Sequence, residues 1–299
     1  MANKPLPVVI DTDIGDDIDD ALALALALNS PELDLRGVTT VYGPVATRTK
    51  MALKLLSVYD RSDIPVAAGR SAPLFGKAND RVPNQAVILD EGESLPDPSP
   101  LSADELILRA ADEAEGQLTL ITIGAMTNAA VALLRDPALA NRVRLIAMGG
   151  VIGLSQAEWN VFCDPEAARV CFDSGIPLTM VGLDVTLKCR MSDDDVAALA
   201  EEGKPGTNLL AGMLGGWRSS ADGQRKLAKP VLHDPLAVAV AMRPGLVTTQ
   251  PRRVGVETRG EFTRGYTLAR GEGEPKVDVC TDVDADAFVR FFMERVLIG

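Results

Sequence analysis

Six aspartates crowd a short stretch near the start of the chain, and their number indicates a metal site. They are Asp11, Asp13, Asp16, Asp17, Asp19 and Asp20. Two carboxylates about 4 Å apart repel each other by about 4 kcal/mol at an effective dielectric constant of about 20, so such a cluster needs a counter-charge. Capping of a helix would use one or two of these acids, not all of them. Because Ca²⁺ and Mg²⁺ prefer carboxylate oxygens, we interpret the cluster as a site for a divalent cation.

Two other metal motifs fit the spacing less well. An EF-hand loop that starts at Asp11 would need Gly at its sixth position and Glu at its twelfth, where the chain has Asp16 and Leu22. A strand followed by D-x-D is also typical of haloacid-dehalogenase-type phosphotransferases, in which the first aspartate is a nucleophile. The Thr or Val expected soon after D-x-D is replaced by Gly15-Asp16-Asp17. A metal-dependent phosphohydrolase with Asp11 as nucleophile is therefore kept only as an alternative.

The elements that position these acids alternate between strands and helices. Residues 7–11 (PVVID) predict a short buried strand, and residues 21–28 (ALALALAL) a buried helix, since Ala and Leu favour helices. Such alternation implies right-handed crossovers and a mostly parallel sheet. We predict an α/β fold with an open, Rossmann-like sheet flanked by helices. The acid cluster then lies beyond the carboxyl end of the first strand, where ligands bind in such sheets.

The same rhythm continues along the chain. Further strands are predicted at 35–43, 65–69, 118–124, 143–150 and 177–185, and further helices at 46–59, 103–116, 127–137, 164–175 and 284–297. Residues 70–102 predict a long surface loop that borders the substrate site, and residues 250–277 contain a short hairpin. No low-complexity linker divides the chain, so we predict one domain over residues 1–299.

Composition limits the classes of partner. The formal charge of -12 and the pI of about 4.7 oppose binding to a nucleic-acid backbone or to an anionic membrane surface. No signal peptide is evident, and the apolar run at 21–28 is shorter than the roughly 20 residues of a membrane span, which predicts a cytoplasmic protein. Four cysteines at no metal-ligand spacing are expected to be reduced and mostly buried.

Seven sequence blocks resemble the inosine-uridine nucleoside hydrolase family. They are DTDIGDDIDDALAL at 11–24, GVTTVYG at 37–43, ITIGAMTNAA at 121–130, MGG at 148–150, AEWNVFCDPEAA at 157–168, GLDVT at 182–186 and HDPLAVA at 233–239. The resemblance implies the nucleoside hydrolase fold and hydrolysis of ribonucleosides to ribose and free base, within nucleoside metabolism and purine or pyrimidine salvage. It also implies a homodimer or homotetramer.

The resemblance assigns a calcium ion to four donors. These are Asp13, Asp20, the backbone carbonyl of Ile123 and Asp234. Calcium held there would orient the sugar and lower the pKa of a bound water, and Asp13 is implied as the general base for that water.

Five further residues receive roles at the substrate. Asp19, Glu158 and Asn160 are implied to contact the ribose hydroxyls, although Glu158 and Asn160 can also be ordinary polar residues before a helix that Asp164 caps. His233 is the only histidine in the chain, and we take it as a general acid or hydrogen-bond donor to the leaving base. Trp217, in GMLGGWRSS, is interpreted as a base-contacting residue of a mobile lid.

The chain also departs from the family pattern. Ile14 replaces the usual Pro, and two extra residues separate D-T-D-I-G from Asp19-Asp20-Ala21. Asp11, Asp16 and Asp17 therefore stay open as further ligands or as residues that support the ligands.

Two differences concern the substrate. Pro44 stands where many relatives have Asn, and the long loop carries AVILDEGE at 86–93 instead of an HG pair. They motivate a further alternative, a calcium-dependent ribosyl-ligand binding protein without catalysis.

Overall fold

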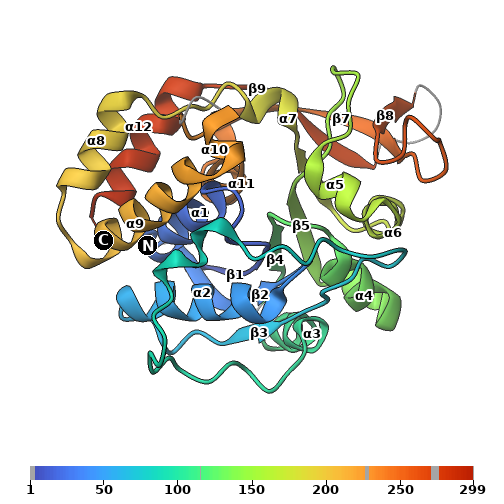
Figure 1. Cartoon of the computed structure of the whole chain (residues 1–299). Coiled ribbons are helices and arrows are strands. Elements are labelled where there is room, and N and C mark those ends of the chain that lie inside the picture. The colour runs from blue at the N-terminus through green and yellow to red at the C-terminus, as the bar shows by residue number, and fades with distance from the viewer. Residues whose placement is uncertain (1–3, 115, 226–228, 271–275, 299) are drawn as a thin grey trace.

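The computed structural model describes residues 4–114, 116–225, 229–270 and 276–298, and in these ranges nine strands form one sheet. Its order is β3-β2-β1-β4-β5-β6-β9-β7-β8. The strands are β1 (Leu6–Thr12), β2 (Leu33–Thr40), β3 (Val66–Ala68), β4 (Leu118–Thr122), β5 (Val143–Met148), β6 (Leu178–Val181), β7 (Val247–Val256), β8 (Thr267–Arg270) and β9 (Val277–Val283). The first six strands and β9 pair in parallel, whereas β7 is antiparallel to both β9 and β8. The predicted open, mostly parallel α/β sheet is confirmed (Figure 1).

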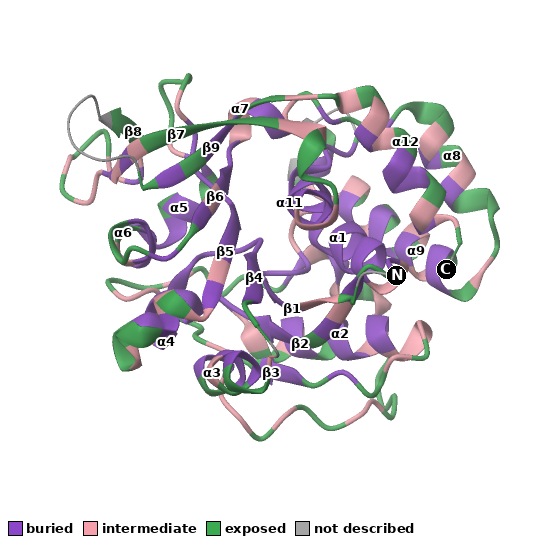
Figure 2. Cartoon of the chain, turned by 180° about the vertical axis from the view of Figure 1, so that it is seen from behind, coloured by how far each residue is buried: buried purple, intermediate pink, exposed green. Residues whose placement is uncertain are grey.

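Helices cover both faces of this sheet and enclose two hydrophobic cores. In β1, Val8 and Ile10 belong to one core and Val9 to the other, and all three are fully buried. The first core contains α1 (Asp19–Leu28), α2 (Val45–Val58), α8 (Asp193–Glu201), α9 (Pro205–Ser219), α11 (His233–Met242) and α12 (Ala285–Val296). The second contains α3 (Ala103–Glu113), α4 (Thr127–Arg135) and α6 (Pro165–Asp173). Figure 2 shows the central strands as buried and the outer faces of the helices as exposed.

Local sequence explains where the helices begin. Helix α1 is apolar on every side after its two acids and is buried along nearly its whole length, as a helix of that composition must be. Helix α3 begins with a capping box in which Ser102 and Glu105 satisfy each other's backbone N–H groups. Asp164 caps α6 by accepting from the backbone N–H of Ala167, and Pro165 occupies the first position, as the sequence predicts.

The structure corrects several predicted boundaries and leaves one prediction open. The strands predicted at 35–43, 118–124 and 143–150 end at Thr40, Thr122 and Met148. The strand predicted at 177–185 ends at Val181, because the chain turns there into the short helix α7 (Leu183–Thr186). The hairpin predicted at 250–277 is formed by β7 and β8, and residues 271–275 lie outside the described residues. The single-domain organisation over residues 1–299 stays a prediction.

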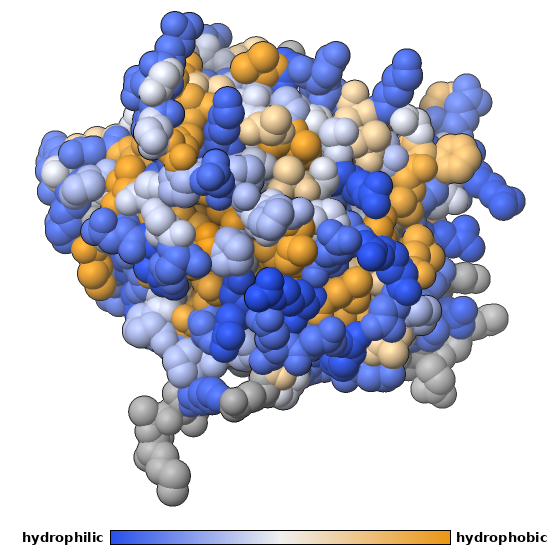
Figure 3. All heavy atoms as spheres, turned by 90° about the horizontal axis from the view of Figure 1, so that it is seen from below, coloured by the Kyte–Doolittle hydropathy of each residue, from blue (hydrophilic) through white to orange (hydrophobic). Residues whose placement is uncertain are grey.

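The long segment 70–102 is irregular apart from the 3-10 helix η1 (Asn84–Ile88), which packs against α9. Figure 3 views the molecule from the side on which this segment lies, and polar and apolar side chains are interspersed there. Among the helices that the structure describes, none has the length and apolar character needed to cross a membrane.

Candidate active site

A cavity of about 610 Å³ opens where three neighbouring strands end. Asp13 follows β1, Ile123 follows β4, and Met148 is the last residue of β5. The predicted site residues that line the cavity are Asp13, Asp16, Asp17, Asp19, Asp20, Ile123, Glu158, Asn160, His233 and Asp234. The carboxyl edge of the sheet thus gathers residues that are up to 221 positions apart in the sequence (from Asp13 to Asp234).

Three buried carboxylates form the tightest group in this cavity. Asp19 and Asp20 lie in the first turn of α1, and Asp234 lies in the first turn of α11, which packs against α1. One oxygen from each lies within 4.8 Å of the others. Asp13 lines the same cavity, but the tight group contains Asp19 in place of the predicted ligand Asp13. The backbone N–H of Asp234 donates to Asp19 Oδ2 at 3.3 Å, which links the two helix ends.

Burial and mutual repulsion disfavour the charged form of these acids when no cation is bound. Burial raises the pKa of Asp13 to about 6. Burial, together with the neighbouring aspartates, raises the pKa values of Asp20 and Asp234 well above their usual range. A divalent cation would offset this repulsion. The donors of the cluster are all oxygen atoms, which hard cations such as Ca²⁺ prefer. The residues present therefore fit a hard metal ion, and the acid cluster can hold one.

Glu158 and Asn160 make more structural contacts than the sequence indicates. Glu158 caps the short helix α5 (Trp159–Cys163), and its carboxylate accepts from the backbone N–H groups of Gly150, Asn160 and Val161 at 2.8–3.0 Å. The amide nitrogen of Asn160 donates to the carbonyls of Ile123 at 3.0 Å and Met148 at 3.1 Å. Asn160 therefore orients the carbonyl that is predicted to bind calcium.

His233 begins α11 and points its ring toward a hydroxyl. Its Nδ1 lies 2.7 Å from Thr186 Oγ1, and the side chain is 8% exposed at the cavity wall. Thr186 can donate to Nδ1 of the neutral ring or accept from Nδ1–H, and in both arrangements the contact holds the ring in place at the cavity wall.

Two predicted site residues do not reach the cavity. Asp11 is fully buried, and its Oδ1 accepts from Thr39 Oγ1 at 2.5 Å and from Asn128 Nδ2 at 2.7 Å. A nucleophile must meet its substrate, so this burial opposes the phosphohydrolase alternative. Trp217 belongs to α9 and is fully buried in the hydrophobic core, so its interpretation as a residue of a mobile lid is wrong.

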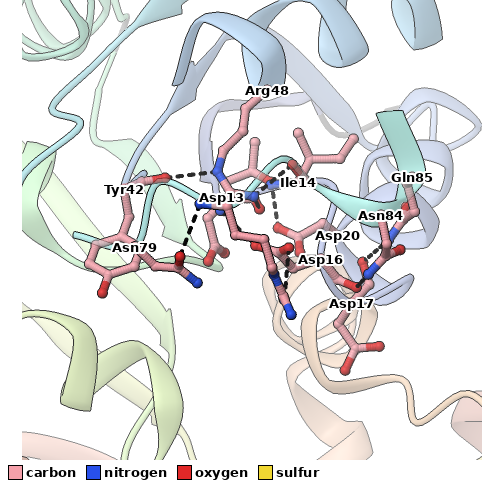
Figure 4. A network of polar contacts seen from close by, with 12 residues as sticks. Asp13, Ile14, Asp16, Asp17, Asp20, Tyr42, Arg48, Asn79, Asn84 and Gln85 are labelled. Atoms are coloured by element: carbon pink, nitrogen blue, oxygen red, sulfur yellow. Dashed lines mark hydrogen bonds and ion pairs between the residues drawn. The ribbon is translucent and has the colours of Figure 1, made fainter. Parts of the chain in front are cut away.

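The sequence did not reveal a second group of cavity residues. Tyr42, Arg48, Asn79 and Arg81 form one wall, and Figure 4 shows Tyr42, Arg48 and Asn79 beside the aspartate loop. Asn79 and Arg81 come from the long 70–102 segment, which therefore borders the cavity as predicted. A signal for Arg48 exists in the helical spacing, because Arg48, Met51, Ala52 and Leu55 share one buried face of α2.

The fold and the site define an α/β enzyme with an acid-rich ligand cavity. A sequence model of the inosine-uridine preferring nucleoside hydrolase family matches residues 8–290, and the chain belongs to this family. A pyrimidine-specific ribonucleoside hydrolase RihA of Escherichia coli is 35% identical over 309 aligned positions, which cover 97% of this chain and 98% of that protein. The predicted family and the predicted enzyme class, a nucleoside hydrolase, are confirmed.

Solved structures agree with this assignment. The plant nucleoside hydrolase PpNRh1 superimposes with a TM-score of 0.89 at 29% identity and covers 99% of this chain and 100% of that one. A purine-preferring ribonucleoside hydrolase from Gardnerella vaginalis has a TM-score of 0.86 at 30% identity, with coverages of 97% and 98%. The predicted fold class is therefore confirmed at the level of the whole chain.

Proposed function

We propose that the chain hydrolyses ribonucleosides to ribose and free base at a calcium site held by Asp13, Asp20, Asp234 and the carbonyl of Ile123. The observation that carries this proposal is the buried group of Asp19, Asp20 and Asp234, whose carboxylate oxygens lie within 4.8 Å of one another, with Asp13 on the wall of the same cavity. Calcium, when bound, supplies a centre that orients ribose hydroxyls and lowers the pKa of a coordinated water. Asp19 adjoins the same ligands and accepts a hydrogen bond from a ribose hydroxyl.

Asp13 is the proposed general base. Its carboxylate lies at the wall of the cavity that contains the acid cluster, where it can accept a proton from a water beside the sugar. The attacking water loses its proton to Asp13 as the bond between the sugar and the base breaks. The positive charge that develops on the sugar is stabilised by the surrounding carboxylates.

The ribose is oriented by residues that the backbone already holds in place. Glu158 is fixed by three backbone N–H groups, and Asn160 is fixed through its amide nitrogen. The carbonyl oxygen of Asn160 is the side-chain atom left to accept from a sugar hydroxyl. Such rigid donors and acceptors position the substrate without a further entropic cost at binding.

The leaving base requires a proton or a hydrogen bond, and His233 is the proposed donor. Thr186 lies 2.7 Å from Nδ1 and holds the ring at the cavity wall. The protonated ring transfers its Nε2 proton to the departing base, which neutralises the charge that builds up there, and is left as neutral imidazole.

The charge of the cavity favours nucleosides over nucleotides. Seven carboxylates line it, against two guanidinium groups: Asp13, Asp16, Asp17, Asp19, Asp20, Glu158 and Asp234 against Arg48 and Arg81. Even one calcium ion leaves this wall negative, and a 5′-phosphate is repelled. We therefore propose an uncharged nucleoside as the substrate.

A reducing-sugar assay across purine and pyrimidine ribonucleosides tests this function, because the relatives named above differ in base preference. We expect ribose release that a calcium chelator abolishes and added calcium restores. Nucleoside binding without base release over hours would favour the non-catalytic alternative.

The role of His233 is tested in the same assay. His233→Ala is expected to slow natural nucleosides far more than 4-nitrophenyl riboside, whose leaving group needs no acid. Equal losses on both substrates would refute the acid role.

We further propose a homodimer or homotetramer in the cytoplasm, as the family resemblance implies. Size-exclusion chromatography with light scattering measures the assembly, and a monomer at micromolar concentration would contradict it. Cell fractionation measures the location.

A further inference from the structure

A buried arginine lies directly beneath the aspartate loop. Arg48 is 2% exposed, and it reaches from α2 to four groups on that loop and on the turn after β2. Its Nε donates to the carbonyl of Tyr42 at 2.8 Å, and its Nη1 donates to the carbonyls of Asp13 and, at 2.9 Å, of Ile14. Its Nη2 forms an ion pair with Asp16 Oδ2 at 2.8 Å (Figure 4).

The shape of the guanidinium matters in this arrangement. Three nitrogens of one planar group meet three carbonyls and one carboxylate, whereas a lysine ammonium is a point charge with three donors. A buried cation is tolerated only when it is paired and hydrogen-bonded, and Arg48 satisfies both conditions. Its contacts with Asp13 are made by the backbone, so the Asp13 carboxylate stays available to the cavity.

Asp16, the carboxylate partner of Arg48, belongs to the two-residue expansion of the family motif. The outer side of this expansion is held by the 70–102 segment. Asn84 Nδ2 donates to the carbonyl of Asp16 at 2.6 Å, and Gln85 Nε2 donates to that of Asp17 at 2.5 Å. Contacts with Arg48 on the inner side and with η1 on the outer side therefore hold the expansion in place.

Gly15 shows how closely the two segments fit. Its φ of +125° is one that other residues rarely adopt, and a Cβ there would lie 2.7 Å from Pro83 Cβ. The loop cannot shift outward toward η1, and it cannot shift inward past Arg48. The backbone that carries Asp13 is consequently held in one place.

We propose that Arg48 is a positioning residue of the hydrolase, which through its ion pair with Asp16 and its bonds to the Asp13 and Ile14 carbonyls sets the Asp13 carboxylate toward calcium and water. This inference rests on the proposed function, in which Asp13 is both ligand and base. It assigns a role to the expanded loop, since Asp16 anchors the guanidinium and does not contact the substrate.

Two variants separate positioning from simple charge balance. Arg48→Lys keeps the charge but loses the planar set of N–H donors, and Arg48→Met loses both. Supporting groups around metal ligands typically contribute about 10- to 100-fold in metal affinity or activity. We expect both variants of the full-length chain to lower kcat by about 10- to 100-fold with a smaller change in KM, because among the described residues Arg48 makes no hydrogen bond with Asp19 or Glu158 and their contacts are kept.

Calcium affinity, measured by isothermal titration calorimetry, provides a readout that needs no turnover. It is expected to fall with kcat in both variants. Asp16→Asn keeps the side-chain length and removes the ion pairs with Arg48 and with Arg81, so it should shift calcium affinity in the same direction. It also serves if the Arg48 variants fail to fold.

Arg135→Met is the matched control, because Arg135 pairs with the buried Asp104 far from the cavity. It should lower the melting temperature and leave kcat and calcium affinity unchanged. The inference is overturned if Arg48→Lys restores both quantities, or if Arg48→Met lowers only the melting temperature, as Arg135→Met does. An inactive parent would instead refute the proposed function, and the calcium titrations would still decide the role of Arg48.

Discussion

Buried aspartates occur in two contrasting settings in this molecule. Asp104, in the first turn of α3, is 1% exposed and forms an ion pair with Arg135. Burial alone would raise its pKa, yet hydrogen bonds from Arg135 and Ser102 hold that pKa below its usual range. Asp20 and Asp234 expose a similarly small part of their surface, but they lie deeper in the protein, and this burial and the neighbouring aspartates raise their pKa values instead.

The two settings also differ in the source of the positive charge beside the carboxylate. At Asp104 the chain provides an arginine, which makes the carboxylate a contributor to stability. At the cluster, Arg48 turns its donors to backbone carbonyls and to Asp16, so the described side chains leave Asp20 and Asp234 to repel each other. Among the described residues, Asp20 and Asp234 form no ion pair with an arginine or lysine, and buried acids in such a setting mark the place for a ligand.

Among the variants that test this comparison, Asp13→Asn is expected to change activity most. Asparagine keeps the size and one ligand oxygen but cannot take a proton from water. Turnover of the best nucleoside should fall by about 10²- to 10⁴-fold, the usual contribution of a general base. The measurement is kcat at saturating calcium.

Asp104→Asn is the control for that experiment, since it changes a buried aspartate outside the cavity and should preserve kcat. A loss of less than about tenfold in Asp13→Asn would assign the base to another residue.

The sequence predicted most of what local chemistry determines. The strand at 7–11 and the helix at 21–28 follow from periodicity, and the place of Asp13 follows from the end of its strand. The gathering of Asp13 and Asp234 in one cavity was implied by the family resemblance. Trp217 was misplaced because a glycine-rich stretch looks mobile, whereas tertiary packing against η1 stabilises it as helix α9.

Contacts between distant segments were beyond the sequence. The bond from Asn160 to Ile123 joins residues 37 positions apart, and the Arg48–Asp16 pair joins residues 32 apart. In neither pair does the sequence around one residue indicate which residue is its partner. Asp11 was left open as a further ligand for the same reason. It lies inside β1, where its carboxylate accepts from Thr39 and Asn128, whereas Asp13 follows the strand and lines the cavity.

Asp234→Asn tests the comparison through the free energy of unfolding, measured with and without calcium. Without metal, the variant should be more stable than the parent, because one of the repelling carboxylates becomes neutral. With calcium at about 100 times its Kd, the parent should gain about 2.7 kcal/mol and the variant much less. Urea unfolding in chelator and in calcium measures both quantities. Equal stabilisation of the two proteins by calcium would place the metal elsewhere.

Asp104→Asn gives the smallest effect and has the opposite sign. It should cost about 1 kcal/mol at pH 7 with or without calcium, since Arg135 is half exposed and its pairing is partly screened. The folded-state pKa of Asp104 is lowered, so its charge stabilises the protein above the unfolded-state pKa of about 3.9 and this contribution is lost as the pH falls through the lower folded value. Unfolding curves of parent and variant from pH 7 to pH 3 should therefore converge at the acid end. A difference that grows on acidification would mean that the ion pair does not stabilise the charged form, and the contrast between the two settings would fail.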